Sequence, residues 1–501
     1  MRAISLVKRI EFDFTGNVAR NALTLGDIDN DGCNELIVGN QTGDVTIFKG
    51  QEKIQTISKL NFITCLAVGD IMNKNKNVLI IITADGWCYL YANPENNQSD
   101  SSQKDIDEGV EEVDGQTQSS SISGSNETLP IDIVLPVTSK KDKTQLVCVH
   151  MQRIPANSKN IVLGDLDGDG NIEMVLGLTD RVVRSYKWIG NPDKSAVDIT
   201  DSGLQFDPSD KLLGKFVAIN KWECANQIGS ITIHHAADGK PSILIAQPGG
   251  TFMRIKCQTD YLTGEECIES SLRSSSSSST GENISGTVDY QFLGMARMRN
   301  QNISTEILGD IRCSMNDSGV SFDKISTTSQ RSSSSTTKGK PYALATLDGT
   351  ILLVQDEIIL WSIAVDHQIF ALTKMDVTGN GSDDIVACSW DGETYIMDQE
   401  KNCVRFHLDE AVQAFHSGYY NLKPNEPDTQ CLIYVTFKNT IIIYYDLALK
   451  ELTCKKFEPD LLKLSELFIN DDRTPEESVE YVKNLDKKSK RELVEYLLYN
   501  S

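Results

Sequence analysis

Short apolar or alternating runs recur along the chain, and a tight-turn pair precedes each of them. Asp-Gly and related pairs in front of β-branched and aromatic residues are typical of β-hairpins. The second residue of each turn pair marks the position of the repeat. The runs are TGDVTIF (42–48), DGWCYLY (85–91), DRVVRSY (180–186), GGTFMRI (249–255), DGTILLV (348–354), DGETYIM (391–397) and KNTIIIY (438–444), with markers Gly43, Gly86, Arg181, Gly250, Gly349, Gly392 and Asn439. The pattern predicts seven hairpins.

The spacing of these markers predicts one large repeat architecture. Gly43 and Gly86 lie 43 residues apart, as do Gly349 and Gly392. A unit of that length holds four strands, which is the size of a propeller blade. We therefore predict an all-β fold, a seven-bladed β-propeller over residues 1–450. A pair of β-sandwiches with coincidental turns is the alternative.

The N-terminus and the longer gaps complete this prediction. The segment ISLVKRIEF (4–12) can add a strand to the last blade and close the ring, which removes exposed edges. Three gaps between markers exceed one unit, and each contains a long polar stretch. Such stretches bury too little apolar surface to offset the entropy of ordering them. We predict long disordered insertions at about 93–129, 190–212 and 268–340.

An acidic loop recurs in register with the hairpins. Asp27, Asp70, Asp165 and Asp376 each lie 16 residues before the marker of their unit. Two of the loops, GDIDNDGCNE and GDLDGDGNIE, have a complete set of acids, and a third is degenerate. The candidate metal ligands are Asp27, Asp29, Asp31 and Glu35 in the first complete loop, Asp165, Asp167, Asp169 and Glu173 in the second, and Asp376, Asn380 and Asp384 in the degenerate loop.

These loops do not have the pattern of an EF-hand. That loop needs a bidentate Glu at its twelfth position and helices on both sides, whereas position twelve is Val38 or Leu176 and the flanks are β-like. Asp and Asn side chains also bind the amides of their own turns. We interpret the loops as structural turns first and as weak Ca²⁺ sites second, and we expect no required cofactor.

Charge and composition restrict the ligands and the compartment. The formal net charge of −23 disfavours nucleic acid and anionic lipid as direct ligands. The N-terminus has no apolar run of the kind that a secretory signal needs. The 12 cysteines are scattered without a CxxC pair, as expected for buried free thiols in a reducing compartment. We expect a cytoplasmic protein with no direct membrane insertion.

The C-terminal segment, residues 459–501, has a different pattern. Thr474, followed by Pro475 and by Glu477, predicts the capped start of a helix. The sequence SKRE (489–492) predicts a second capping box. We expect a short helical tail, which either docks on the propeller or binds a partner.

Two long blocks of the chain resemble a known family. The blocks IPANSKNIVLGDLDGDGNIEMVLGLTDRVVRSYKW (154–188) and VDHQIFALTKMDVTGNGSDDIVACSWDGETYIMD (365–398) are similar to the integrin α FG-GAP repeat-containing protein 2 family. The resemblance implies a subunit of the KICSTOR scaffold, with a kaptin-like propeller protein among its partners. It further implies recruitment to the lysosomal surface, where KICSTOR holds the Rag GTPase-activating complex and restrains target-of-rapamycin signalling when amino acids are scarce.

Three classes of function compete at this stage. The first is a non-catalytic scaffold subunit, since the chain has no G-x-S-x-G, H-E-x-x-H, Walker A or G-x-G-x-x-G motif. The second is an integrin-like adhesion or ligand-binding propeller module, which an export signal or a transmembrane tail would favour. The third is a propeller hydrolase, which needs polar residues that converge at the central channel.

Overall fold

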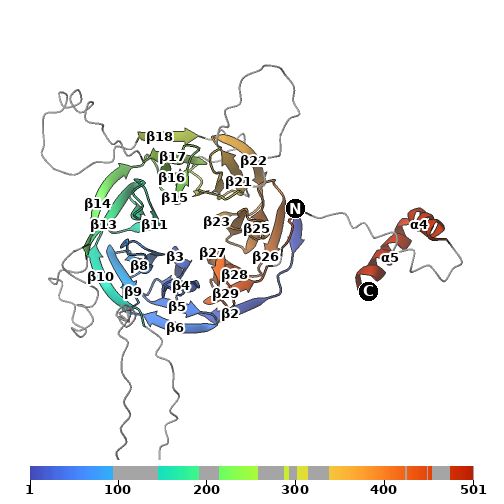
Figure 1. Ribbon diagram of the computed structural model, residues 1–501, viewed down its shortest axis with the longest axis horizontal. Coiled ribbons are helices and arrows are strands. Elements are labelled where there is room, and N and C mark those ends of the chain that lie inside the picture. The colour runs from blue at the N-terminus through green and yellow to red at the C-terminus, as the bar shows by residue number, and fades with distance from the viewer. Residues whose placement is uncertain are drawn as a thin grey trace, which may run out of the picture. The chain divides into compact units, whose positions relative to one another are not determined.

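The computed structural model describes most of the chain and divides it into two compact units, Met1–Leu452 and Thr453–Ser501. The first unit is a ring of β-sheets (Figure 1) and the second contains two helices. Of the predicted insertions, 94–129, 191–212 and most of 268–340 lie outside the described residues. The structure describes residues 1–93, 145–190, 214–257, 287–292, 302–313, 338–423, 426–447, 449–453 and 474–499.

The ring is built from antiparallel meanders that follow one another along the chain. Their innermost strands contact one another in the cyclic order β3, β7, β11, β15, β19, β23, β27 and back to β3, so the ring closes. The strands of the first half are β3 (Val18–Gly26), β4 (Glu35–Asn40), β5 (Val45–Lys49), β6 (Glu52–Ile57), β7 (Ile63–Gly69), β8 (Val78–Thr83), β9 (Trp87–Ala92), β10 (Val147–Arg153), β11 (Ser158–Gly164), β12 (Glu173–Leu178), β13 (Val182–Gly190) and β14 (Gly214–Glu223). Those of the second half are β15 (Ile231–His235), β16 (Pro241–Gln247), β17 (Thr251–Lys256), β18 (Thr287–Phe292), β19 (Thr305–Leu308), β20 (Tyr342–Thr346), β21 (Thr350–Gln355), β22 (Ile358–Ala364), β23 (Ile369–Met375), β24 (Asp384–Ser389), β25 (Glu393–Met397), β26 (Cys403–His407), β27 (Val412–Tyr420), β28 (Thr429–Thr436) and β29 (Thr440–Tyr445).

The prediction of an all-β propeller is confirmed, but the described strands form six hydrogen-bonded sheets rather than seven. One sheet has eight strands, in the order β10-β9-β8-β7-β3-β4-β5-β6. It consists of two antiparallel meanders that meet where Asn21 of β3 pairs in parallel with Cys65 of β7. Neighbouring innermost strands approach closely at the centre of a ring, and here they come close enough to pair. The turn pattern could not predict that pairing.

The N-terminal segment closes the ring, as predicted. Strand β2 (Arg9–Asp13) pairs antiparallel with β29, which is the last strand of the ring in the sequence. In addition, β1 (Arg2–Ile4) pairs in parallel with β26 of the preceding sheet. The first thirteen residues therefore join two sheets formed by the end of the ring, while β3 opens the first sheet.

All seven hairpin markers occupy the left-handed backbone region, and each lies between the second and third strands of its meander. The glycines among them have φ between 68° and 94°, and Arg181 and Asn439 have φ of 68° and 63°. At Gly43 a Cβ would lie 1.7 Å from the carbonyl oxygen of Leu60, so this turn needs both the positive φ and the missing side chain. The prediction of seven hairpins is confirmed.

The predicted insertion at 268–340 is partly wrong. Strand β18 pairs with β17 along its whole length, and β19 pairs with β20. Both strands lie within the predicted insertion. The short segments TVDYQF and TEIL give no clear strand signal, because the neighbouring Ser-rich residues dominate the hydrophobicity averaged over a sequence window.

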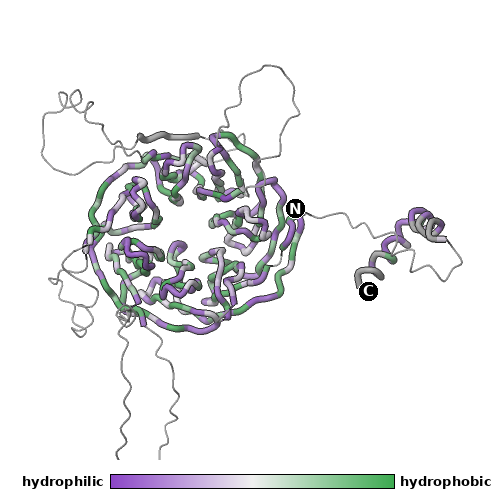
Figure 2. Tube along the Cα trace, in the orientation of Figure 1, coloured by the Kyte–Doolittle hydropathy of each residue, from purple (hydrophilic) through white to green (hydrophobic). Residues whose placement is uncertain are grey.

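The core lies between neighbouring sheets. Every residue of β4, β8, β12 and β24 is buried, because the second strand of a blade is covered on both faces. Such strands are expected to be short continuous apolar runs rather than alternating ones. Towards the rim, hydrophilic and hydrophobic residues alternate around the ring (Figure 2).

The second unit contains α4 (Pro475–Asn484) and α5 (Lys487–Tyr499). The predicted capping box of Thr474 and Glu477 is confirmed. The predicted box at SKRE is wrong, because α5 begins two residues earlier and the Asp486 carboxylate accepts from the amides of Lys488 and Ser489. Among the described residues, no helix has the length and apolar character needed to cross a membrane.

Candidate functional site

The acidic loops all lie on one face of the ring. Each connects the first strand of a meander to the second, as between β3 and β4 or between β11 and β12. The seven hairpins connect second to third strands and therefore lie on the opposite face. The turn between the third and fourth strands returns to the face of the acidic loops, which brings the end of β5 near the first loop.

The first Asp of each loop binds the amides of its own loop. Asp27 accepts from the amides of Asp31 and Gly32 at 3.0 and 2.9 Å. The other three loops repeat this arrangement with their own amides. Asp70 accepts from Lys74 and Asn75, Asp165 accepts from Gly168 and Gly170, and Asp376 accepts from Gly379, Asn380 and Gly381. The carboxylate thus supplies the acceptors that the tight turn lacks, which is the role of a structural turn residue.

The acid at the ninth position of the loop is buried. Glu35 and Glu173 are fully buried, and each accepts from the amide of the residue after the first Asp, namely Ile28 and Leu166. Burial raises the pKa of Glu35 to about 7. Burial also raises the pKa of Glu173 above its usual value.

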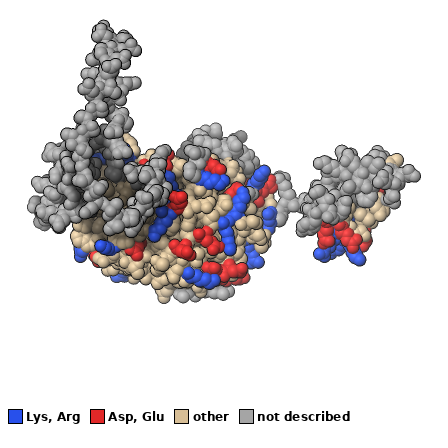
Figure 3. Space-filling view, turned by 90° about the horizontal axis from the view of Figure 1, so that it is seen from below, with Lys and Arg blue, Asp and Glu red and all other residues tan. Residues whose placement is uncertain are grey.

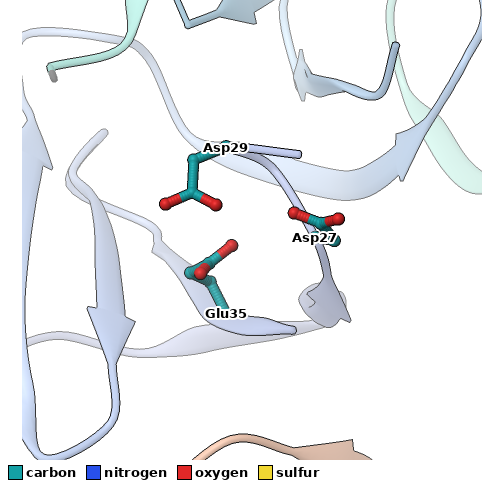
Figure 4. Close-up of side chains that lie close together, drawn as sticks. All are labelled: Asp27, Asp29 and Glu35. Carbon is teal, nitrogen blue, oxygen red and sulfur yellow. The ribbon is translucent and has the colours of Figure 1, made fainter. Parts of the chain in front are cut away.

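The structure brings together most of the predicted ligands of the two complete loops. The carboxylates of Asp27, Asp29 and Glu35 lie within 4.8 Å of one another and face one another in Figure 4. Asp165, Asp167 and Glu173 form the same group in the other loop. Asp31 and Asp169 belong to these clusters as well, because they share a partner with the other acids, as follows.

A lysine contacts three acids of each complete loop. In the first loop, Lys49 Nζ lies 2.5 Å from Asp29 Oδ2, 2.6 Å from Asp31 Oδ2 and 2.8 Å from Glu35 Oε1. Burial opposes the charge on Lys49, but the bonds to these carboxylates outweigh it and raise the pKa of the ammonium. Lys49 therefore carries a positive charge throughout the physiological range of pH.

The second complete loop repeats the arrangement. Lys187 Nζ lies 3.1 Å from Asp167 Oδ2, 2.5 Å from Asp169 Oδ2 and 3.3 Å from Glu173 Oε1. The bonds to Asp169 and Asp167 again outweigh burial and raise the pKa of Lys187.

Strand register explains how each lysine reaches its loop. Leu36 pairs with Phe48, so that Glu35 stands directly across from Lys49 on the neighbouring strand. The register of β12 and β13 places Glu173 across from Lys187 in the same way. Residues directly opposite in an antiparallel pair lie on the same side of the sheet.

In the degenerate loop, the residue across from the ninth position is not a lysine. Ile385 pairs with Met397, which puts Asp398 across from Asp384 where the complete loops have lysine. Asp384 accepts from the amides of Val377 and Thr378. Burial raises the pKa of Asp384 to about 6, and the charge of Asp398 contributes in the same direction. Asn380, the third predicted residue of this loop, accepts from the amide of Ser382.

In the complete loops an ammonium contacts oxygens that a calcium ion would use as ligands. Calcium takes six to eight oxygen ligands at about 2.3–2.6 Å. Here three carboxylate oxygens already contact the ammonium of Lys49, and both oxygens of Asp27 accept backbone amides. An ammonium and a calcium ion cannot both use the same oxygens at these distances.

Sequence reasoning missed both lysines, although a signal was present. Lys49 and Lys187 each follow the first Asp of their loop by 22 residues. The register shared by all four loops runs from the first Asp to the hairpin marker. Extending the same register by six residues beyond the marker would have found the two lysines.

The loops also join neighbouring meanders. Asn77 donates from its amide to Asn30 Oδ1 and from Nδ2 to the Asp27 carbonyl, which links the loops after β3 and β7. Ile172 donates to Asn73 Oδ1 and links the loop after β7 to the loop after β11. The acidic loops after β3, β7 and β11 thus form a hydrogen-bonded chain along one face.

Polar side chains also converge on the innermost strands, where a propeller hydrolase would place its catalytic groups. Arg20 of β3 forms an ion pair with Glu306 of β19, although these strands are not neighbours in the ring. Lys159 of β11 donates to the carbonyl of Ile228, and Lys374 of β23 donates to that of Gly309. These groups bind one another or the backbone.

Comparison with known proteins places the chain in a family. The model of the integrin-alpha FG-GAP repeat-containing protein 2 family matches residues 49–449. The chain belongs to this family. The resemblance of the two blocks quoted above is therefore confirmed.

Two curated relatives of the family cover most of the chain. The KICSTOR complex protein ITFG2 of Mus musculus is 33% identical over 470 residues, which are 93% of this chain and 89% of the relative. The Bos taurus protein of the same name is 32% identical and covers 90% of this chain, with 73% of its own length aligned.

Solved structures with a similar course of the chain have low sequence identity. BBS1N, in a crystal structure of its complex with ARL6DN soaked with lead, aligns with a TM-score of 0.49 and 12% identity, over 88% of this chain and 97% of that one. Saccharomyces cerevisiae Sqt1 aligns with a TM-score of 0.43 and 12% identity, over 89% and 98%.

Proposed function

We propose that this protein is a non-catalytic scaffold subunit of a KICSTOR-like complex at the lysosomal surface. The observation that carries the proposal is the 33% identity to a protein named as a KICSTOR complex subunit, over nearly the full length of both chains. In this role the protein pairs with a kaptin-like propeller protein and other KICSTOR subunits. Through them it recruits the Rag GTPase-activating complex and restrains target-of-rapamycin signalling when amino acids are scarce.

We count the ring as seven-bladed. The eight-stranded sheet then consists of two blades, which are joined where Asn21 pairs with Cys65. A closed ring offers broad faces and a rim whose geometry is fixed by many strand pairs, which suits a passive organiser. The converging polar groups of the innermost strands are engaged with one another, as in the pair of Arg20 and Glu306, or with the backbone, as for Lys159 and Lys374. That favours the scaffold over a propeller hydrolase.

Charge supports attachment through partners rather than through lipid. The net charge of −23 opposes binding to the anionic cytoplasmic leaflet. At the rim of the ring, which Figure 3 shows from the side, acidic and basic side chains lie in neighbouring patches, a surface that suits a protein partner of mixed charge. We therefore expect a cytoplasmic protein that reaches the lysosome by way of its partners.

The proposal is tested by loss and rescue in cells. Removing the protein should leave the target-of-rapamycin kinase active during amino-acid starvation, and the Rag GTPase-activating complex should leave the lysosome. The tagged protein should co-purify with a kaptin-like propeller. A normal starvation response without the protein, together with no kaptin-like protein in the purified material, would defeat the proposal and restore an adhesion or ligand-binding module as the alternative.

The blade rim allows a sharper arm of the same test. Ile358 and Leu360 of β22 are 66% and 47% exposed, and among the described strands β22 pairs with β21 alone. Contiguous exposed apolar residues mark interaction surfaces more often than isolated ones do. We expect Ile358→Asp with Leu360→Asp to reduce co-purification of the partner, whereas Val7→Asp, at an isolated exposed position, should not. Equal co-purification with both variants would exclude this rim.

A further inference from the structure

Each complete acidic loop contains a cation supplied by the protein itself. Lys49 contacts oxygens of three different side chains, Asp29, Asp31 and Glu35, at 2.5 to 2.8 Å. Several carboxylates arranged around one point are how a protein holds a hard cation. Charge-assisted contacts of this kind are short and roughly twice as strong as neutral hydrogen bonds.

The arrangement occurs twice, in different sheets. Lys187 contacts Asp167, Asp169 and Glu173 in the second loop. In both cases the lysine stands across from the buried Glu and follows the first Asp by 22 residues. A chance contact of a long surface side chain would not reproduce the same partners at the same register.

The loops need a positive charge for a physical reason. Glu35 and Glu173 are fully buried, and burying a carboxylate without a counter-charge costs several kcal/mol. Two aspartates beside each of them add to the negative charge. A weak calcium site would meet this need only where calcium is abundant, at about 10⁻⁴–10⁻³ M. A lysine on the adjacent strand is present at all times because it is covalently attached.

We propose that Lys49 and Lys187 are built-in cations that occupy the place of calcium in these two loops. The loops keep their shape at any calcium concentration, and each becomes a divalent-cation site when its lysine is removed. This inference does not depend on the proposed cellular function, since it concerns the purified protein alone.

The test compares the full-length protein with Lys49→Met, Lys187→Met and the control Lys53→Met. Lys53 lies exposed on β6, outside the acidic groups. Calorimetric titration with CaCl₂ measures binding, and melting in EDTA or in CaCl₂ measures its effect on stability. We expect no calcium response from the wild type or from Lys53→Met. Lys49→Met and Lys187→Met should each melt about 5 °C lower in EDTA, regain most of that loss in millimolar CaCl₂, and bind calcium with a Kd of about 10⁻⁴–10⁻³ M.

A second variant keeps the test decisive if a methionine variant does not fold in EDTA. Lys49→Arg retains the positive charge, and we expect it to fold without calcium and to show no calcium response. Refolding of Lys49→Met from urea should then succeed in CaCl₂ and fail in EDTA. Two results would overturn the inference. One is calcium binding by the wild type with the same affinity, and the other is methionine variants that never respond to calcium, whether they fold or not.

Discussion

The loops after β3 and β23 share their backbone hydrogen bonds, but the residues that lie across from their buried acids have opposite charges. In both, the first Asp accepts amides of its own loop, and the ninth residue accepts the amide next to that Asp. The residue across the strand pair differs, since Glu35 faces Lys49 whereas Asp384 faces Asp398. The comparison teaches that the turn is held by Asp-to-amide bonds, and that burial raises the pKa of the ninth residue in both loops, to about 7 for Glu35 and to about 6 for Asp384. What differs is the neighbour of that acid, which is a lysine in one loop and a second carboxylate in the other.

The largest difference should follow from removing the lysine. Lys49→Met leaves three acids facing one another, and removing one partner of a buried ion pair costs about 3–5 kcal/mol. Because the Lys49 side chain is 30% exposed, we expect a loss of about 3 kcal/mol in the free energy of unfolding at pH 7.5 in EDTA. Urea unfolding measures it.

The control for this change is Lys53→Met, which should stay within about 0.5 kcal/mol of the wild type. The loss in Lys49→Met should also shrink as the pH falls through 7, because protonation of Glu35 removes one of the charges that the lysine balances. A pH-independent loss would show that Lys49 acts through the packing of its alkyl stem alone.

The shared part of the comparison predicts equal effects in the two loops. Asp27→Ala and Asp376→Ala each remove a carboxylate that accepts at least two amides, and hydrogen bonds to a charged group contribute about 1.5–3 kcal/mol. We expect a loss of about 2 kcal/mol in both variants, by urea unfolding. Asp27→Asn and Asp376→Asn retain an acceptor and should lose less. A loss in one loop only would break the comparison.

The degenerate loop should respond to pH through Asp384. Its pKa is about 6 in the folded protein and 3.8 in the unfolded chain, so the folded state binds the extra proton between these values. Stability from this group is therefore complete below pH 3.8 and is lost as the pH rises through 6. Asp384→Asn keeps an acceptor for the amides of Val377 and Thr378 and has no charge to bury.

We therefore expect Asp384→Asn to be more stable than the wild type by about 1–2 kcal/mol at pH 7.5, with no difference near pH 3.8. Urea unfolding at a series of pH values gives the difference curve. A variant that is less stable than the wild type at pH 7.5 would mean that the ionised carboxylate is needed in this loop.

Much of the fold was predictable because its signals are local. The positive-φ turn residues, such as Gly43 and Asn439, can be read from dipeptides, and the spacing from Asp27 to Gly43 recurs in three other units. The pairing of β2 with β29 was predictable too, since a closed ring needs a strand from the other terminus. The family resemblance came from the same two blocks.

What could not be predicted depends on pairing between strands. The repeat register singles out Lys49 in the sequence, but its strand reads VTIFK, and nothing in those letters says that Glu35 lies opposite. The same holds for the parallel pair of Asn21 and Cys65, which merges two meanders into one sheet. Strand β18 was missed because its six residues lie among polar stretches. Local periodicity predicts strands and turns, whereas the register of strand pairing determines which residues meet at a site.

The smallest expected effect comes from moving the lysine into the degenerate loop. Asp398→Lys would place an ammonium across from Asp384, as Lys49 stands across from Glu35. The favourable cross-strand pair contributes about 0.2–1 kcal/mol. It is partly offset because Asp398 accepts from the amides of Glu400 and Asn402 in its own turn. We therefore expect a net change in stability within about 0.5 kcal/mol at pH 7.5.

The informative measurement is the carboxyl titration of Asp384 by NMR, in which its pKa should fall from about 6 towards the usual range. Asp398→Asn is the matched control, because it removes the negative charge without adding a positive one and should lower that pKa less. If Asp398→Lys left the titration of Asp384 unchanged, the residue across the strand pair would not influence the pKa of the buried acid. The contrast between the two loops would then need another cause.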